Sequence, residues 1–220
     1  MNRNAPSKRT TRRSGIHAAC ATALALAAAV ALPAHAGKVT PPSVPYNLQV
    51  NAGSRAFLVG HAFGTQNYVC APSASSSTGV AYVLFTPEAT LVNDDLDQLT
   101  THYFSPNTNP ADPNTNPAVL ADGAIRPTWQ HSKDMSKVWG KLHPNGSAVL
   151  DTTALAWLLL DVVGTEDGLD GGDILSKTTQ IQRLNTTGGL APSAGCASPS
   201  DLGHQAYVDY TADYYFYTNQ

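Results

Sequence analysis

Short runs of β-favouring residues alternate with turn-forming residues along most of the chain. The apolar run 155–163 is compatible with a core strand or a short helix, and the runs around it favour a strand. No long amphipathic helix pattern is present, so we predict one all-β domain with long loops, an antiparallel β-sandwich or a β-barrel. The pattern does not separate these two architectures. The predicted strands are residues 56–59, 66–70, 80–85, 87–92, 138–142, 155–163, 178–184 and 207–217.

The segments between these runs carry their own signals. Residues 37–45 are proline-rich and are expected to run extended over the surface, and Asn145-Gly146 is a turn signal. The motif Pro-Asn-Thr-Asn-Pro at 106–110 recurs at 113–117, in a stretch without core-forming residues. Proline removes ladder hydrogen bonds and opposes helix, so we expect residues 106–118 to form an exposed loop insertion.

The N-terminal 36 residues have the pattern of a cleavable export signal. An almost wholly Ala, Leu and Val run at 18–32 is too short to cross a bilayer, and Ala34 and Ala36 suit signal peptidase. We therefore expect export by the general or the twin-arginine route and cleavage after Ala36. The mature domain, residues 37–220, is then expected to be periplasmic or extracellular. The basic residues that precede the apolar run are Arg3, Lys8, Arg9, Arg12 and Arg13.

Removal of this signal makes the protein clearly acidic. The chain has 13 Lys and Arg, and loss of the five in the signal leaves eight against 16 Asp and Glu, a formal charge of −8. Such a surface repels phosphate backbones and anionic lipids, so we expect neither nucleic acid nor a membrane surface as a partner. We also expect no membrane span after cleavage of the signal. The remaining 184 of 220 residues suit a single domain, and the oligomeric state stays open.

Cysteine usage agrees with export. Cys20 lies in the signal, so the mature chain keeps only Cys70 and Cys196. Disulfides persist in oxidising compartments, and we predict that these two residues are bonded, although two separately buried thiols are the alternative.

Several phrases of the chain form an ordered set of motifs, at 66–70, 85–91, 102–103, 127–129, 157–160, 181–186, 188–192, 195–196 and 210–217. Taken together, they resemble the domain-of-unknown-function 3455 family of exported bacterial and fungal proteins. The resemblance covers nearly the whole mature chain and implies that both cysteines belong to the family pattern, but it implies no activity. The chain departs from that pattern at Ala156, where a proline is usual, and at Arg126, where a glycine is expected. The 106–118 insertion also separates two phrases that normally lie close together.

No established catalytic or cofactor-binding signature is present, so we expect no cofactor. The acidic and glycine-rich stretch 166–173 offers oxygen ligands to calcium, but it fits no known calcium loop and a solvated turn is the favoured interpretation. The mature histidines lack the tight spacing of metal ligands, and we expect no metal site. These histidines are His61, His102, His131, His143 and His204.

A polar and aromatic set drawn from the family-like phrases is the best candidate for a ligand site. Aromatic rings stack on flat ligand faces, Gln and Arg fix hydroxyls or carboxylates, and His exchanges protons near neutral pH. Each residue also has a structural interpretation, with the aromatic residues in packing and Arg183 bound to a carboxylate or carbonyl. The set comprises Gln66, Tyr68, His102, Trp129, Arg183 and Asn185.

Three hypotheses follow from this set. The first is a periplasmic or extracellular binding module for a small polar or carbohydrate-like ligand. The second is a secreted hydrolase or lyase in which His102 acts as general acid or base, helped by Glu88 or Asp213. The third is a structural envelope or surface protein. Convergence of the candidate residues in one pocket would favour the first two.

Overall fold

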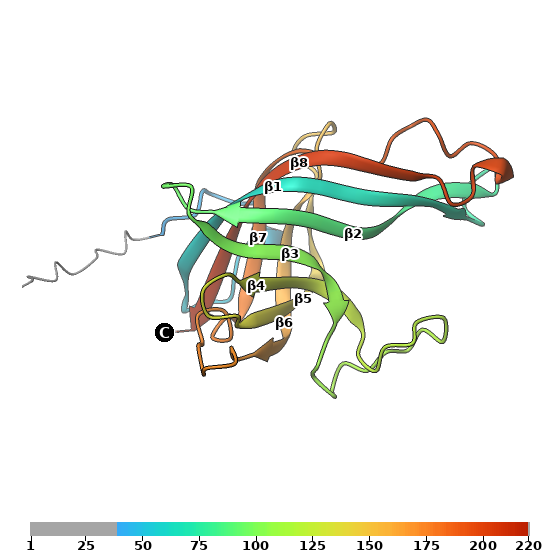
Figure 1. Ribbon diagram of the computed structural model, residues 1–220. Coiled ribbons are helices and arrows are strands. Elements are labelled where there is room, and N and C mark those ends of the chain that lie inside the picture. The colour runs from blue at the N-terminus through green and yellow to red at the C-terminus, as the bar shows by residue number, and fades with distance from the viewer. Residues whose placement is uncertain (1–38, 220) are drawn as a thin grey trace, which may run out of the picture. The chain divides into compact units, whose positions relative to one another are not determined.

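The computed structural model describes residues 39–219, and eight antiparallel strands form a closed barrel in chain order, with β8 pairing back onto β1 (Figure 1). The all-β prediction is confirmed, and of the two open architectures the barrel is the one formed. The predicted export signal, residues 1–36, lies outside the described residues. The elements are η1 (Tyr46–Leu48), β1 (Ser54–Pro72), β2 (Val80–Val92), β3 (Gln98–Pro106), β4 (Ile125–His131), β5 (Lys137–Ala148), β6 (Trp157–Glu166), β7 (Gln180–Gly188), η2 (Pro199–Asp201) and β8 (Gln205–Asn219).

Three strands continue past the end of the barrel. The pairing of β2 with β3 stops at Ala89 and His102, whereas β2 stays paired with β1 as far as Val80. β8 follows β1 along the same stretch, so β1, β2 and β8 project together as an arm, residues 66–87 with 205–208 (Figure 1). The barrel is therefore open between β2 and β3 on the side where the arm leaves it.

Alternation along β8 separates the inside of the barrel from an outer cluster. Tyr214 and Phe216 point into the main core, where Phe216 is fully buried. Tyr215 and Tyr217 point the other way and pack with Leu184 in a second cluster. Full burial of a side chain such as Phe216 contributes about 2 to 3 kcal/mol of stability. Because side chains alternate along a strand, the residues of β8 pack into two separate layers, one on each face of the strand.

The N-terminal lead-in covers the outer cluster as a strap, residues 39–50. Val39 and Val44 pack against that cluster, and Leu48 is fully buried. The Gln182 side chain donates to the Leu48 carbonyl at 2.6 Å, and the Asn51 amide donates to Gln180 Oε1 at 2.8 Å. Polar side chains of β7 thus fix the strap to the barrel.

Glycines in β1 mark close packing, whereas the sequence pattern indicated a break between two strands. A Cβ atom at Gly60 would lie 2.9 Å from Leu91 Cβ, and one at Gly64 would lie 2.0 Å from the Glu88 carbonyl oxygen. Both positions need glycine because β2 approaches β1 closely there. One long strand therefore replaces the two predicted runs.

The Asn-Gly turn signal produces a bulge rather than a hairpin. Strand β5 continues through Asn145, whose φ is 60°, and its register against β6 shifts between Leu142 and Ser147. The Asn47 side chain of the strap donates to the backbone carbonyls of Asn145 and Ser147. Asn145, in the left-handed region, therefore bends the strand. The next apolar run forms β6, which agrees with the strand preference for 155–163.

The duplicated Asn-Pro insertion forms a repeated series of Asx turns. In each copy, both asparagine side chains accept a hydrogen bond from the backbone amide two residues further on. In the first copy, Asn107 and Asn109 also donate to the Val163 carbonyl. Asn107 is only 3% exposed. The expectation of an exposed insertion is therefore wrong at Asn107. Its side-chain amide is buried because it donates to a β6 carbonyl in place of a neighbouring strand's backbone amide.

Arg126 holds this insertion to β4. Its guanidinium donates to both Asp112 carboxylate oxygens, at 2.6 and 2.8 Å. The side chains of Asp112 and Arg126 are 17% and 24% exposed, so the pair is partly solvated. The insertion and Arg126 therefore form one unit.

We predict a measurable pH signature for this ion pair. The hydrogen bonds from Arg126 lower the pKa of Asp112 to about 2. Because this folded-state pKa is depressed, the carboxylate contributes stability that is complete above about pH 4 and is lost as the pH falls towards 2. Asp112→Asn should lower the free energy of unfolding at pH 7 by no more than about 1 kcal/mol, given the solvent screening.

Urea denaturation across this pH range tests the ion pair, with Asp122→Asn, an exposed site in the same loop, as the matched control. An Asp112→Asn deficit that stays constant from pH 7 to pH 2 would contradict the assignment.

Cys70 and Cys196 form a disulfide, as predicted, with Cα atoms 5.4 Å apart. Cys70 lies near the end of β1, in the arm, and Cys196 lies in the connection between β7 and β8. The Cys70 amide donates to the His204 carbonyl, and the Gly203 amide donates to the Cys70 carbonyl. The bond therefore fastens the β7–β8 connection to the arm.

Loss of this disulfide should destabilise the whole domain. The cysteines are 126 positions apart, and the chain-entropy model gives up to about 4 to 5 kcal/mol for a loop of that size. The double variant Cys70→Ser and Cys196→Ser should unfold at clearly lower urea concentration than the oxidised parent. Equal midpoints for the variant and the oxidised parent would mean that the bond adds nothing.

Candidate functional site

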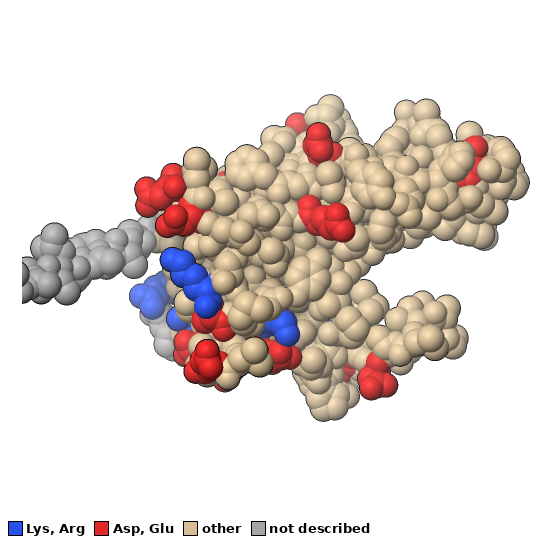
Figure 2. Space-filling model, in the orientation of Figure 1, with Lys and Arg blue, Asp and Glu red and all other residues tan. Residues whose placement is uncertain are grey.

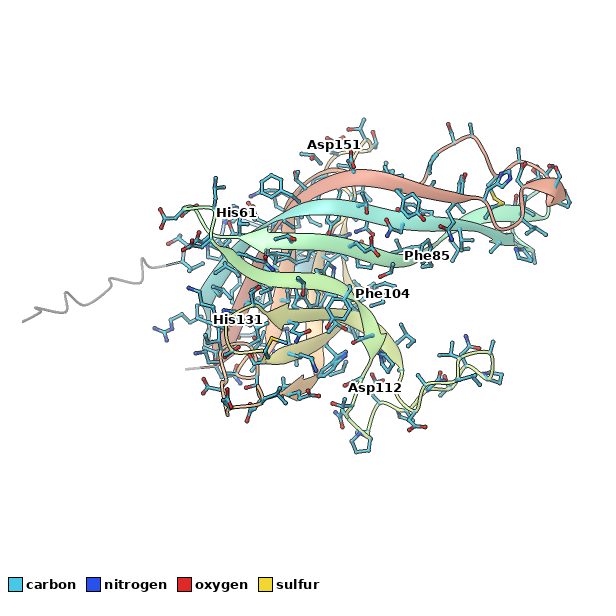
Figure 3. The ribbon with its side chains drawn as sticks, viewed as in Figure 1. His61, Phe85, Phe104, Asp112, His131 and Asp151 are labelled. Atoms are coloured by element: carbon cyan, nitrogen blue, oxygen red, sulfur yellow. A yellow bond between two sulfur atoms is a disulfide. The ribbon has the colours of Figure 1, made fainter. Side chains whose placement is uncertain are left out.

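A cavity of about 120 Å³ opens at the end of the barrel where β2 and β3 separate. Figure 2 shows the molecule hollowed between the arm and the 106–118 insertion, with mainly uncharged residues at its border. In Figure 3, Phe85 lies on β2 and Phe104 on β3, beside this hollow. The cavity is lined by Gln66, Leu84, Pro87, His102, Phe104, Pro127, Trp129, Leu158, Leu160, Arg183 and Tyr214.

Four of the six candidate residues meet in this cavity. Gln66 comes from β1, His102 from β3, Trp129 from β4 and Arg183 from β7. Arg183 follows Ile181 at a spacing of two, and Ile181 is a fully buried core residue, so both point into the barrel. Positions far apart in the sequence therefore converge because each lies on the inner face of its strand.

The other two candidates lie elsewhere. Tyr68 is buried, but its hydroxyl donates to the Gly189 carbonyl at 2.6 Å, outside the residues that line the cavity. Asn185 has a φ of 49° and an exposed side chain, whose amide donates to Asp213 on β8. Both side chains hold neighbouring segments of the barrel together.

His102 stacks on Trp129 at the base of the cavity. The two ring centroids are 4.2 Å apart and the planes differ by 8°. Tyr214 approaches Trp129 edge-on at 5.4 Å and lies 5.2 Å from the His102 ring. The three rings interlock, so the two nitrogen-bearing rings have fixed orientations.

The surroundings of His102 keep its imidazole neutral. Burial lowers the pKa of His102 to about 3, and the nearby Arg183 charge acts in the same direction. Its Nδ1 lies 2.9 Å from the Thr128 carbonyl oxygen. A carbonyl can only accept, so Nδ1 carries the proton and Nε2 is left as an acceptor. A histidine with this pKa is a weak general acid or base near neutral pH.

Neither proposed helper carboxylate bonds to His102. Asp213 Oδ1 lies 2.7 Å from His61 Nδ1, on the opposite face of β8 from Tyr214. Glu88 is exposed and borders a shallow depression together with His102, but the two share no hydrogen bond or ion pair. No carboxylate lines the cavity itself.

Two lining residues carry a buried nitrogen without a hydrogen-bond partner, and a third has no carboxylate partner. The two nitrogens are Trp129 Nε1 and Gln66 Nε2, and the Gln66 side chain also interacts with the Tyr210 hydroxyl. Arg183 donates twice to the Ala156 carbonyl but forms no ion pair with any carboxylate of residues 39–219. Unpartnered buried polar atoms also occur outside the lining, on Ser54, Asn67, Thr100 and Thr178, so the feature that distinguishes the cavity is the unpaired charge of Arg183.

The sequence search missed the apolar walls and Tyr214. The signal for Tyr214 was the alternation along β8, which places it on the inner face with Phe216. The two prolines carried no such signal, because their place in the wall depends on where the pairing of β2 with β3 ends. The missed lining residues are Leu84, Pro87, Phe104, Pro127, Leu158, Leu160 and Tyr214.

The acidic stretch 166–173 folds around Asp134. A Cβ atom at Gly168 would lie 1.6 Å from the Asp134 carbonyl oxygen, and Asp134 Oδ2 accepts the Ile174 amide at 2.9 Å. Within residues 39–219, no three His, Cys, Asp or Glu side chains converge as a possible metal-ligand group. No helix of the described chain is long and apolar enough to cross a membrane.

The fold and the site define a small antiparallel β-barrel protein with a partly open cavity at one end. Residues 51–218 match the model of the family described as protein of unknown function (DUF3455), and the chain belongs to that family. No curated protein and no solved structure shows significant similarity to this chain.

The neutral state of His102 gives a direct prediction. Because its folded-state pKa lies below the usual 6.5, protonation should oppose folding, and stability should fall as the pH drops from about 6.5 towards 3. An NMR titration of the histidine rings should therefore find no change at His102 above about pH 4. A His102 midpoint near 6.5 would contradict the buried, neutral assignment.

Proposed function

We propose that the mature protein is an exported binding module that holds a small polar ligand in the cavity at the end of the barrel. The observation that carries this proposal is an arginine without a carboxylate partner in a largely apolar, partly open pocket. Ligand sites typically combine apolar walls with a few convergent polar groups. A ligand with acceptor atoms would pair with the Arg183 guanidinium.

Access to the cavity follows from the strand pairing. The last β2–β3 pair, Ala89 with His102, lies at the rim, and beyond it the two strands separate. One hydrogen bond, from the Phe104 amide to Thr86 Oγ1 at 3.1 Å, crosses the gap. A ligand can enter beside this bond without disturbing the rest of the barrel.

Binding is favoured over turnover by the state of His102. Its Nδ1 is engaged by a carbonyl, its pKa is about 3, and no carboxylate accompanies it in the cavity. A hydrolase or lyase needs a group that exchanges protons at the working pH. A neutral, fixed His102 suits recognition, in which a stable tautomer accepts one hydrogen bond.

Export is the second part of the proposal. The N-terminal charge and apolar pattern is typical of a signal peptide, and a disulfide such as Cys70–Cys196 persists in the periplasm or outside the cell. The mature charge of −8, from eight basic and 16 acidic residues, supports a soluble small molecule over nucleic acid as the partner.

A thermal-shift screen of organic acids, glycans and other small polar molecules tests the binding function. We expect at least one compound to raise the melting temperature of the parent and to lose this effect in Leu84→Trp, where the larger ring blocks the cavity wall. Val83→Trp is the matched control, because Val83 is an exposed neighbour on the same strand that does not line the cavity. Hits that bind both variants equally would place the site elsewhere.

A further inference from the structure

The charge of the cavity is set by one residue. Arg183 is the only lining residue with a formal charge, since His102 is neutral and no Asp or Glu contributes to the wall. Other half-buried cations are neutralised, as Arg126 pairs with Asp112 and Lys137 with Glu166. Arg183 has no such partner among residues 39–219 and leaves an uncompensated positive charge in the pocket.

The guanidinium is held in a fixed orientation. Its Nε and Nη2 atoms both donate to the Ala156 carbonyl oxygen, at 3.3 and 2.9 Å. A fixed guanidinium plane suits a planar carboxylate, which can accept two parallel N–H bonds.

The rest of the lining is consistent with the same chemistry. Six of the eleven lining side chains are apolar, and none is a carboxylate. A carboxylate offers only acceptors, whereas a sugar carries several hydroxyl protons that need acceptors of their own. Unpaired hydroxyls would be costly against apolar walls, so a carboxylate fits this pocket better than a carbohydrate does.

The rest of the wall limits the body of the ligand. A cavity of about 120 Å³ is close in size to the engineered cavity of about 150 Å³ that binds benzene in another protein. The space therefore suits an apolar body about as large as one ring. The apolar side chains around it are Leu84, Pro87, Phe104, Pro127, Leu158 and Leu160.

From this juxtaposition we propose that the cavity binds a small monocarboxylate, with its charged head at Arg183 and an apolar body of about one ring against the opposite wall. This inference rests on the proposed binding function and adds the class of ligand. A phosphate group carries up to about two negative charges, more than the single cation neutralises. One carboxylate balances the single positive charge of Arg183.

A matched series of ring compounds tests this assignment on the intact mature protein. Benzoate, benzamide, benzyl alcohol and phenyl phosphate share the ring and differ in the head group. In calorimetric titrations at pH 7, benzoate should bind at least about tenfold more tightly than benzamide and benzyl alcohol, the effect of one charged hydrogen-bonding contact. Phenyl phosphate should bind more weakly than benzoate.

Two arginine variants separate the site from general surface charge. Arg183→Gln should remove the benzoate preference, and Arg183→Lys should restore part of it. Arg126→Gln is the matched control, because Arg126 neutralises Asp112 outside the cavity and its loss should leave the preference intact. Near-ultraviolet circular dichroism verifies the fold of each variant. If Arg183→Gln does not fold, the ligand series on the parent still decides.

The outcomes are distinct for the two proposals. Equal binding of benzoate and benzamide, or tighter binding of phenyl phosphate, overturns the carboxylate assignment and leaves the binding function standing. Absence of binding by all four probes at millimolar concentration also overturns it. The binding function fails only if the broad thermal-shift screen yields no compound that depends on Leu84.

Discussion

The early end of the β2–β3 pairing is the constraint on which the site depends. Beyond Ala89 and His102 these strands separate, whereas β2 stays paired with β1 and carries the arm away from the barrel. The inner faces of the remaining strands are then left without a covering layer at that end. Residues from seven strands meet there, and the result is a pocket at a place where a fully paired barrel would be closed.

The pocket holds an arginine without a carboxylate partner, in a molecule that pairs its other half-buried cations. Arg126 neutralises Asp112, and Lys137 pairs with Glu166. At the barrel end, Arg183 donates to the Ala156 carbonyl and forms no ion pair within residues 39–219. A local departure of this kind, in a fold that is consistent at other levels, is typical of a functional site.

Sequence patterns predicted the fold class because alternation and turn residues are local properties. They also placed Gln66, His102, Trp129 and Arg183 in one candidate set, and these four residues share the cavity. The patterns failed where tertiary contact decides. Gly60 and Gly64 continue a strand because β2 lies close to them, and Asn145 bends a strand. The side chains of Tyr68 and Asn185 donate hydrogen bonds to neighbouring segments instead of lining the cavity. Strands β3 and β4 were not predicted, because proline and histidine interrupt their β-favouring residues.

The indole signals of the protein offer the most direct test of a ligand in this cavity. Trp129 Nε1 has no partner in the free protein, whereas Trp139 Nε1 donates to Ser105 Oγ at 2.9 Å and serves as an internal reference. In a ¹H–¹⁵N spectrum with the tightest compound from the small-molecule screen, the Trp129 indole signal should shift because the Trp129 ring lines the cavity, while the Trp139 signal stays in place. A bound compound that leaves the Trp129 signal unchanged would contradict the account.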